Sequence, residues 1–265
     1  MAELRQAIER NELVFFYQPK INFQTNRLEG VEALIRWQHP ERGLILPDQF
    51  ITAAEETGLI KPLAEWELKT ALSQCRLWHQ GGLEFQVSVN LSVRNLHDSM
   101  LPEQVLRLLS ICEVAGTSLM VEITETAIML DPLRAKETLT NLKTMGVQCS
   151  IDDFGTGYSS LSQLRKLPVD EIKIDKSFVM NMATNPNDAA IVRSTIDLAH
   201  DLGLRVVAEG VETREVWEAL KAFGCDVAQG YYVSRPLPSL EWSAWMEGWL
   251  SRSISPAKPV NGADK

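Results

Sequence analysis

The sequence predicts an α/β fold built from repeated strand–helix units. Short apolar runs recur along the chain, and each ends in or beside a carboxylate, amide or ammonium side chain. The polar markers at these ends are Glu32, Asn90, Glu122, Asp152, Lys173 and Glu209. They lie about 20 to 60 residues apart with amphipathic stretches between them, which is the spacing of a strand, a helix and two short loops. A chain of 265 residues suits one α/β barrel or two small domains.

The first two strands are expected to run antiparallel. They are predicted at 13–18 and 28–37, and the segment around Thr25-Asn26 that joins them is too short for a parallel crossover, which needs about a dozen residues or more. A helical region follows from Pro47 to Glu56, and a longer helix spans 61–78. If the strands close into a barrel, the barrel therefore begins with a reversed strand.

From there strands and helices alternate. Further strands are predicted at 84–91, 118–124, 147–152, 170–175, 204–208 and 226–229, and further helices at 102–115, 132–145, 159–166, 187–202, 213–223 and 238–250. Seven of the eight strands are expected to be parallel. In barrels of this kind the active site lies at the carboxyl ends of the strands, where the polar markers fall.

The composition favours one domain over residues 1–250, with 251–265 as a disordered tail or linker. A formal net charge of -9 argues against a binder of nucleic-acid polymers, because such domains usually carry a basic face. The four cysteines are far apart and are expected to be reduced and buried. No signal peptide or membrane segment is evident in the sequence, so we expect a cytoplasmic module, joined to other domains in a longer protein.

Asp152 and Asp153 stand side by side where an apolar run gives way to the glycine loop Phe154-Gly155-Thr156-Gly157. Neighbouring residues on a strand point to opposite faces, so both carboxylates can converge only where the strand stops. One interpretation is a turn in which an aspartate closes the strand. The other is a site for a hard divalent cation, which offsets the repulsion between two adjacent carboxylates.

Several carboxylates and an asparagine carbonyl form an all-oxygen ligand set, which suits Mg²⁺ or Mn²⁺. A shared Asp152 would allow two ions roughly 3.5–4 Å apart, the separation used in phosphoryl transfer. This favours metal-assisted hydrolysis of a phosphate ester. Lys173 and Asp175 are two residues apart on one predicted strand and so share a face. Lys173 either positions or deprotonates the attacking water, or simply pairs with Asp175.

An ordered set of motifs gives the chain a family resemblance. The triplet Glu32-Ala33-Leu34 is followed by Ile35-Arg36, and the same order continues with Asn90-Leu91-Ser92, Glu122-Ile123-Thr124-Glu125, Asp152-Asp153-Phe154-Gly155-Thr156-Gly157, Lys173-Ile174-Asp175, Ala208-Glu209-Gly210-Val211-Glu212 and Gln229-Gly230-Tyr231. The chain resembles the EAL domains, bacterial phosphodiesterases that open cyclic di-GMP. The resemblance covers about residues 3–250 and implies a (βα)₈ TIM-barrel-like fold with an antiparallel first strand.

The resemblance also implies roles for individual residues. Glu32, Asn90, Glu122 and Asp152 are expected to bind a first metal ion, and Asp152, Asp153 and Glu209 a second. Lys173 is similar to the residue that activates or orients the attacking water. Groove-lining and substrate-binding roles fall on Gln18, Leu34, Arg36, Asp175 and Gln229, with Arg36 on a phosphate. Glu125 and Glu212 resemble supports, the first for the loop after Asp153 and the second for the lysine region.

The reaction implied is attack of a metal-activated water on one phosphorus of cyclic di-GMP, with the 3′-oxygen leaving, to give linear 5′-pGpG. Mg²⁺ or Mn²⁺ is expected as cofactor with two ions per site, Ca²⁺ as an inhibitor, and a homodimer as the assembly. Two other readings stay open. One is a catalytically weak sensor module that binds cyclic di-GMP. The other is a different metal-dependent barrel enzyme, for example one that forms an enolate.

Overall fold

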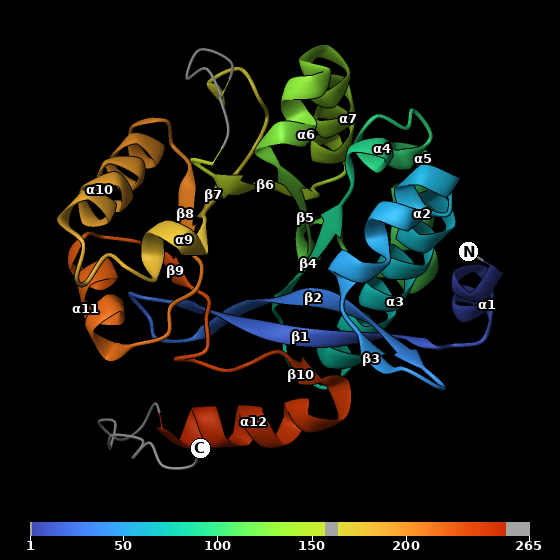
Figure 1. Cartoon of the computed structure of the whole chain (residues 1–265), viewed down its shortest axis with the longest axis horizontal. Helices are drawn as coiled ribbons and strands as arrows, with labels where there is room; N and C mark the ends of the chain where they lie inside the picture. Colours follow the sequence, from blue (N-terminus) through green and yellow to red (C-terminus); the bar gives the residue numbers. More distant parts are fainter. Residues whose placement is uncertain (1, 157–163, 253–265) are drawn as a thin grey trace.

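The computed structural model describes residues 2–156 and 164–252. Within them eight strands close into a ring, and most of the helices lie outside it (Figure 1). In order around the ring the strands are β1 (Leu13–Asn22), β2 (Leu28–His39), β4 (Gln86–Leu91), β5 (Leu119–Thr124), β6 (Gln148–Phe154), β7 (Glu171–Ile174), β8 (Arg205–Ala208) and β9 (Val227–Ala228), which pairs back onto β1.

The direction of the first strand is as predicted. β1 runs antiparallel to both of its neighbours, β2 and β9, while the six remaining pairings around the ring are parallel. The short β1–β2 connection permits only this hairpin geometry. Two short strands, β3 (Gly43–Ile45) and β10 (Leu237–Pro238), pair with β2 and β1 outside the ring. The predicted TIM-barrel-like fold with a reversed first strand is confirmed.

The longer helices also lie where the sequence predicts them. They are α2 (Ile51–Thr57), preceded by the 3₁₀ turn η1 (Pro47–Gln49), α3 (Ile60–Gln80), α5 (Leu101–Cys112), α7 (Pro132–Thr144), α10 (Pro186–Asp201), α11 (Arg214–Ala222) and α12 (Ser239–Arg252). The helix predicted at 159–166 falls largely on residues outside the described part of the chain. α12 includes residues 251 and 252 of the expected tail, and the rest of that tail also lies outside the described residues.

Four helices and one further 3₁₀ turn, η2 (Gly116–Ser118), were not predicted. Besides α1 (Ala2–Glu9), these helices are α4 (Val93–Leu96), α6 (Glu125–Leu130) and α9 (Lys176–Val179), each of which starts within two residues of the end of a barrel strand. The side chains of Ser92, Thr124 and Asp175 accept hydrogen bonds from the first turns of these three helices. Such caps satisfy backbone N–H groups that a helix start leaves unpaired.

The side chains of β1 show how the ring separates its two faces. Phe15 and Tyr17 point outward and pack against Trp66 and Trp78 of α3, with ring centroids 5.2 and 4.8 Å apart. The even-numbered residues Gln18 and Lys20 reach into the ring instead, because side chains alternate along a strand. The outer layer is therefore apolar, while the interior at this point carries polar and charged groups.

One smaller expectation is met. All four cysteines are buried and unpaired. Trp242 of α12 is buried and packs against Trp78 at 5.6 Å and against Phe85 at 5.8 Å, so this tryptophan belongs to the packing between α12 and the barrel. Of the helices in the described residues, each is too short or too polar to cross a membrane.

Candidate active site

The predicted site residues converge at the carboxyl ends of the parallel strands. Glu32 lies on β2, Asn90 on β4, Glu122 on β5 and Asp152 on β6, with Lys173 on β7, Glu209 just after β8 and Gln229 just after β9. The strand register puts Asn90 opposite Glu122 and Thr124 opposite Asp152. Parallel strands that share one orientation bring their ends to one rim, which is why residues far apart in sequence meet here.

Lys173 is the centre of the group. Its buried ammonium lies 2.6 Å from Glu122 Oε2, 2.6 Å from Glu209 Oε1, 3.0 Å from Asp152 Oδ1 and 3.4 Å from Glu32 Oε2. Burial alone would lower the pKa of Lys173, but the surrounding carboxylates outweigh it and hold this pKa well above its usual value. Lys173 is therefore a cation that forms ion pairs with four carboxylates and donates hydrogen bonds to two of them, Glu122 and Glu32.

The carboxylates around Lys173 have unlike environments. Burial raises the pKa of Glu32, and it raises the pKa of Glu209 to about 8. Burial acts in the same direction on Glu122, yet the ammonium groups of Lys173 and Lys20 outweigh it and lower this pKa to about 2. The two ammonium groups thus stabilise the ionised form of Glu122, which is fully enclosed by protein.

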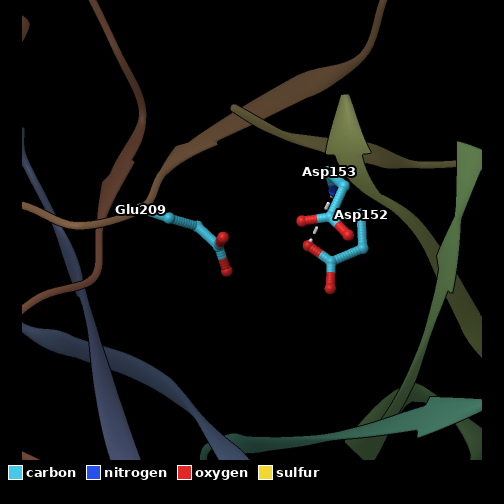
Figure 2. A group of neighbouring side chains, drawn as sticks. All are labelled: Asp152, Asp153 and Glu209. Carbon is cyan, nitrogen blue, oxygen red and sulfur yellow. Dashed lines mark hydrogen bonds between the residues drawn. The ribbon is translucent and has the colours of Figure 1, made fainter. Parts of the chain in front are cut away.

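Asp152, Asp153 and Glu209 face one another across the ring end (Figure 2). Their carboxylate oxygens lie within 4.8 Å of one another, and all three side chains are half-buried. Burial, followed by the charges of Asp152 and Asp175, raises the pKa of Asp153. An oxygen-only donor set that repels itself in this way fits a hard divalent cation.

The backbone explains how two adjacent aspartates reach one side. Asp153 has φ of 54°, in the left-handed region, and its N–H donates to Asp152 Oδ1 at 3.0 Å. The β6–β7 register shifts between Ile151 and Phe154, where the strand ends. A backbone turn follows, in which the Thr156 N–H donates to the Asp153 carbonyl at 3.3 Å. The aspartates therefore lie both at a turn that ends the strand and in an acidic cluster, and the two interpretations of this motif are compatible.

A second subgroup forms around Glu32. Asn90 Nδ2 donates to Glu32 Oε1 at 2.7 Å, and Gln229 Nε2 donates to Glu32 Oε2 at 2.5 Å. Gln229 also donates to Gln18 Oε1 at 3.1 Å. The structure thus brings together Glu32, Asn90, Gln18 and Gln229, which lie on or just after four different strands.

Leu34 and Arg36 lie further along β2, and both are half-buried. The Arg36 guanidinium lies 5.8 Å from the ring centroid of Phe16 and donates to the carbonyl of Ile35 at 2.8 Å. Arg36 is a cation. Because side chains alternate along a strand, Glu32, Leu34 and Arg36 lie in that order on the same face of β2.

Asp175 does not pair with Lys173 in the described structure. Its carboxylate instead caps α9 by accepting from the Ser177 N–H at 2.9 Å and from the Ser177 hydroxyl. The interpretation of Lys173 as a mere partner of Asp175 is therefore wrong, because the ammonium contacts four other carboxylates.

The two expected supports differ in their positions. Glu125 is buried, and its Oε2 accepts from the Gly155 N–H at 3.2 Å, so it holds the start of the loop that follows Asp153. Glu212 is exposed, and no contact among the described residues joins it to Lys173. Its support of the lysine region stays a prediction.

Sequence reasoning missed two charged residues inside the barrel, Lys20 and Glu171. Lys20 of β1 is buried, ion-pairs with Glu122 Oε1, and donates to Ser88 Oγ at 2.9 Å. The signal available in the sequence was its position two residues after Gln18, which places both side chains on one face of the strand.

Comparison with known proteins places the chain in a family. The family model described as EAL domain matches residues 1–236, and the chain belongs to the EAL domain family. It is 44% identical over 238 residues to the bifunctional diguanylate cyclase/cyclic di-GMP phosphodiesterase MucR of Pseudomonas aeruginosa. This match covers 89% of this chain and 35% of MucR. It is 39% identical over 262 residues to the cyclic di-GMP phosphodiesterase NbdA of the same species, covering 98% of this chain and 34% of NbdA.

A solved structure described as a PaMucR phosphodiesterase complex with c-di-GMP agrees with the fold. It has a TM-score of 0.88 and 44% sequence identity, and the match covers 91% of this chain and 98% of that chain. The present chain spans about a third of the length of the curated relatives MucR and NbdA.

Proposed function

We propose that this chain is a metal-dependent phosphodiesterase that hydrolyses cyclic di-GMP to linear 5′-pGpG. The observation that carries the proposal is the convergence of Lys173 with four carboxylates at the ends of the parallel strands. Relatives named cyclic di-GMP phosphodiesterases support the choice of substrate. The residues to which the family resemblance gives roles in hydrolysis are all present in this chain.

The donor groups fall into two sets that share Asp152. Glu32, Asn90, Glu122 and Asp152 would hold one ion, while Asp152, Asp153 and Glu209 would hold the other. Mg²⁺ or Mn²⁺ suits these oxygen ligands, and Ca²⁺, with longer bonds and looser geometry, is expected to inhibit. When bound, the ions would lower the pKa of a water molecule and offset charge on the phosphoryl oxygens.

The protein side chains would position the water and the nucleotide and form hydrogen bonds with them. In the metal-free cluster the carboxylates hold the pKa of Lys173 above its usual value. Once those carboxylates bind metal ions, Lys173 would position or deprotonate the attacking water. Arg36, on the same strand face as Glu32, would bind a phosphate oxygen. Gln18 and Gln229 present amide groups beside Glu32 and would line the groove for the nucleotide.

The test is product analysis with a matched pair of variants. The purified chain is incubated with cyclic di-GMP and Mg²⁺ or Mn²⁺, and nucleotides are separated by chromatography, with an EDTA sample alongside. Glu32→Gln should lower turnover at least about 100-fold, because even outer partners of metal ligands contribute 10–100-fold. Glu29→Gln, at the opposite end of β2 where Glu29 pairs with Arg205, should keep turnover.

The outcomes separate the candidate functions. Metal-dependent formation of pGpG that is lost in folded Glu32→Gln supports the phosphodiesterase and this site together. A folded Glu32→Gln protein with unchanged turnover contradicts the metal assignment. Cyclic di-GMP that binds but stays intact identifies a sensor module instead. A homodimer and covalent linkage to regulatory domains stay predictions from the resemblance.

A further inference from the structure

A second buried lysine lies inside the barrel, beneath the candidate metal site. Lys20 Nζ contacts Glu122 Oε1, donates to Ser88 Oγ at 2.9 Å, and lies 4.0 Å from Glu171 Oε1. All four side chains are buried. They come from β1, β4, β5 and β7, so the ion pair spans the interior of the ring.

Glu122 is held at both of its oxygens. Oε1 is tied to Lys20, whereas Oε2 lies 2.6 Å from Lys173, on the side where Glu32, Asp152 and Glu209 gather. Because the contact with Lys20 fixes one oxygen, the carboxylate cannot rotate without giving up a buried ion pair. A single oxygen of Glu122 therefore faces the cluster that would bind metal.

Packing does not explain a lysine at this position. The interior of such a barrel is usually filled by branched apolar side chains. A buried ion pair is seldom more stable than an apolar replacement of similar volume, since two charges must leave water. Stability alone therefore does not account for a charged group at this position.

We propose that Lys20 is a positioning residue that fixes Glu122 with one oxygen toward the metal-binding carboxylates, an inference that rests on the phosphodiesterase proposed above. In the described structure, Glu122 is the one proposed metal ligand that Lys20 contacts. Lys20 contributes by orienting Glu122. Loss of Lys20 should therefore lower the affinity of the protein for the metal ion.

A simpler alternative makes the opposite prediction. If Lys20 acted only through its charge, it would repel an incoming divalent cation, and its removal would tighten metal binding. Glu171 permits the two effects to be separated. Removing Lys20 and Glu171 together removes one basic and one acidic side chain, so the formal charge of the barrel interior is unchanged. Glu122 nevertheless loses its contact with Lys20.

The experiment measures Mn²⁺ binding by calorimetry in the absence of any nucleotide. The proteins compared are the unaltered chain, Lys20→Met, Glu171→Gln and the double variant Lys20→Met/Glu171→Gln. If Lys20 orients Glu122, the double variant should bind Mn²⁺ at least about tenfold more weakly than the unaltered chain, whose formal charge it shares, and more weakly than Glu171→Gln; a tenfold loss is typical of a lost outer partner. Lys20→Met should also bind more weakly than the unaltered chain.

The opposite order would overturn the proposal. A charge effect alone makes Lys20→Met bind Mn²⁺ more tightly than the unaltered chain. It also gives the double variant about the affinity of the unaltered chain, at least as tight as that of Glu171→Gln. Circular dichroism and thermal unfolding establish that each variant is folded. Should the lysine variants fail to fold, Ser88→Ala removes the second anchor of Lys20 and leaves every charge in place. It should weaken Mn²⁺ binding a few-fold, and unchanged binding would count against the proposal.

Turnover and Mn²⁺ binding of the unaltered chain show whether the role of Lys20 or the proposed phosphodiesterase function has failed. Hydrolysis of cyclic di-GMP and Mn²⁺ binding by the unaltered chain, without the expected loss in the variants, overturns the role of Lys20 alone. If the unaltered chain neither binds Mn²⁺ nor hydrolyses the dinucleotide, the proposed function fails, and the role of Lys20 fails with it.

Discussion

The ammonium of Lys173 lies 2.6 Å from Glu209 Oε1, although the two residues belong to different strand–helix units. The same ammonium reaches Glu122, Asp152 and Glu32, so one cation holds together the carboxylates that would otherwise repel one another. We therefore expect Lys173 to contribute both to turnover and to the stability of the metal-free protein, and the two contributions can be measured separately.

Lys173→Met should abolish turnover and destabilise the metal-free protein. Breaking a buried ion pair by removing one partner costs about 3–5 kcal/mol, because the remaining charges stay buried and uncompensated. The free energy of unfolding is measured by urea titration in EDTA, and turnover by pGpG formation. Lys69→Met, which changes an exposed lysine of α3, is the control and should alter neither quantity. Lys173→Met with normal turnover would show that the donor is dispensable.

Asp153→Gly should preserve the fold while weakening metal binding. Asp153 has φ of 54°, which glycine adopts without strain, so the free energy of unfolding should stay within about 1 kcal/mol of the unaltered protein. Its carboxylate, however, is one of the three that gather in Figure 2. We expect Mn²⁺ affinity, measured by calorimetry, to fall at least about tenfold.

The control for this prediction is Asn26→Gly. Asn26 has φ of 55° in an exposed turn, so the same relief of backbone strain occurs there away from the carboxylates. It should leave Mn²⁺ affinity unchanged. If Asp153→Gly also left that affinity unchanged, the side chain of Asp153 would serve only the turn.

The sequence was sufficient to predict the ring of strands and the rim where the site lies. The short segment after β1 forced an antiparallel pair, and the polar residue at the end of each apolar run marked the carboxyl ends of the strands. Lys20 could not be placed in the same way. Alternation shows that Gln18 and Lys20 share a face, but only closure of the ring decides that this face is buried.

Asp175 shows a second limit of sequence reasoning. A polar residue just after a strand can be a site residue, a helix cap, or both, because a helix that starts there needs a side-chain acceptor. Asp175 caps the four-residue α9, which is too short to leave a periodic pattern of its own. The sequence therefore predicted the place of Asp175 but not this partner.

Glu67 should make stability depend on pH. It is a buried residue of α3, and burial raises its pKa from 4.5 to about 8. The unfolded chain releases this proton first as pH rises, so the contribution of Glu67 to stability is fully present below pH 4.5. It is lost as pH rises toward 8, by up to about 1.4 kcal/mol per pH unit. Above pH 8 the loss levels off.

Glu67→Gln should remove this contribution to the pH dependence. The difference in free energy of unfolding between the variant and the unaltered protein isolates Glu67 from other groups that titrate in the same window, such as Glu209. That difference should grow in favour of the variant between pH 5 and pH 8, as measured by urea unfolding. Glu56→Gln, at an exposed position of α2, should give a difference that does not vary with pH. A flat difference for Glu67→Gln would mean that Glu67 is ionised throughout.

Gly230→Ala should impair both stability and catalysis, since this glycine allows two backbone segments to approach closely. A Cβ at residue 230 would lie 2.2 Å from the carbonyl oxygen of Val211 and 2.3 Å from its nitrogen. Backbone atoms cannot rotate away, so the segments must separate, at a cost of about 1–3 kcal/mol or more. The Val211 N–H to Gln229 carbonyl hydrogen bond, 3.1 Å long, crosses this contact.

The catalytic part of this prediction follows from the neighbouring residue. Gln229 donates to Glu32 Oε2, so separating the two segments displaces the amide that holds a proposed metal ligand. Gly248→Ala is the matched control, because a Cβ at that position of α12 meets nothing within 4 Å and alanine favours a helix by about 1 kcal/mol. Thermal unfolding and pGpG formation should therefore fall together in Gly230→Ala and stay unimpaired in Gly248→Ala. A stable Gly230→Ala protein that has lost turnover would mean that the barrel tolerates the separation and that only the position of Gln229 matters.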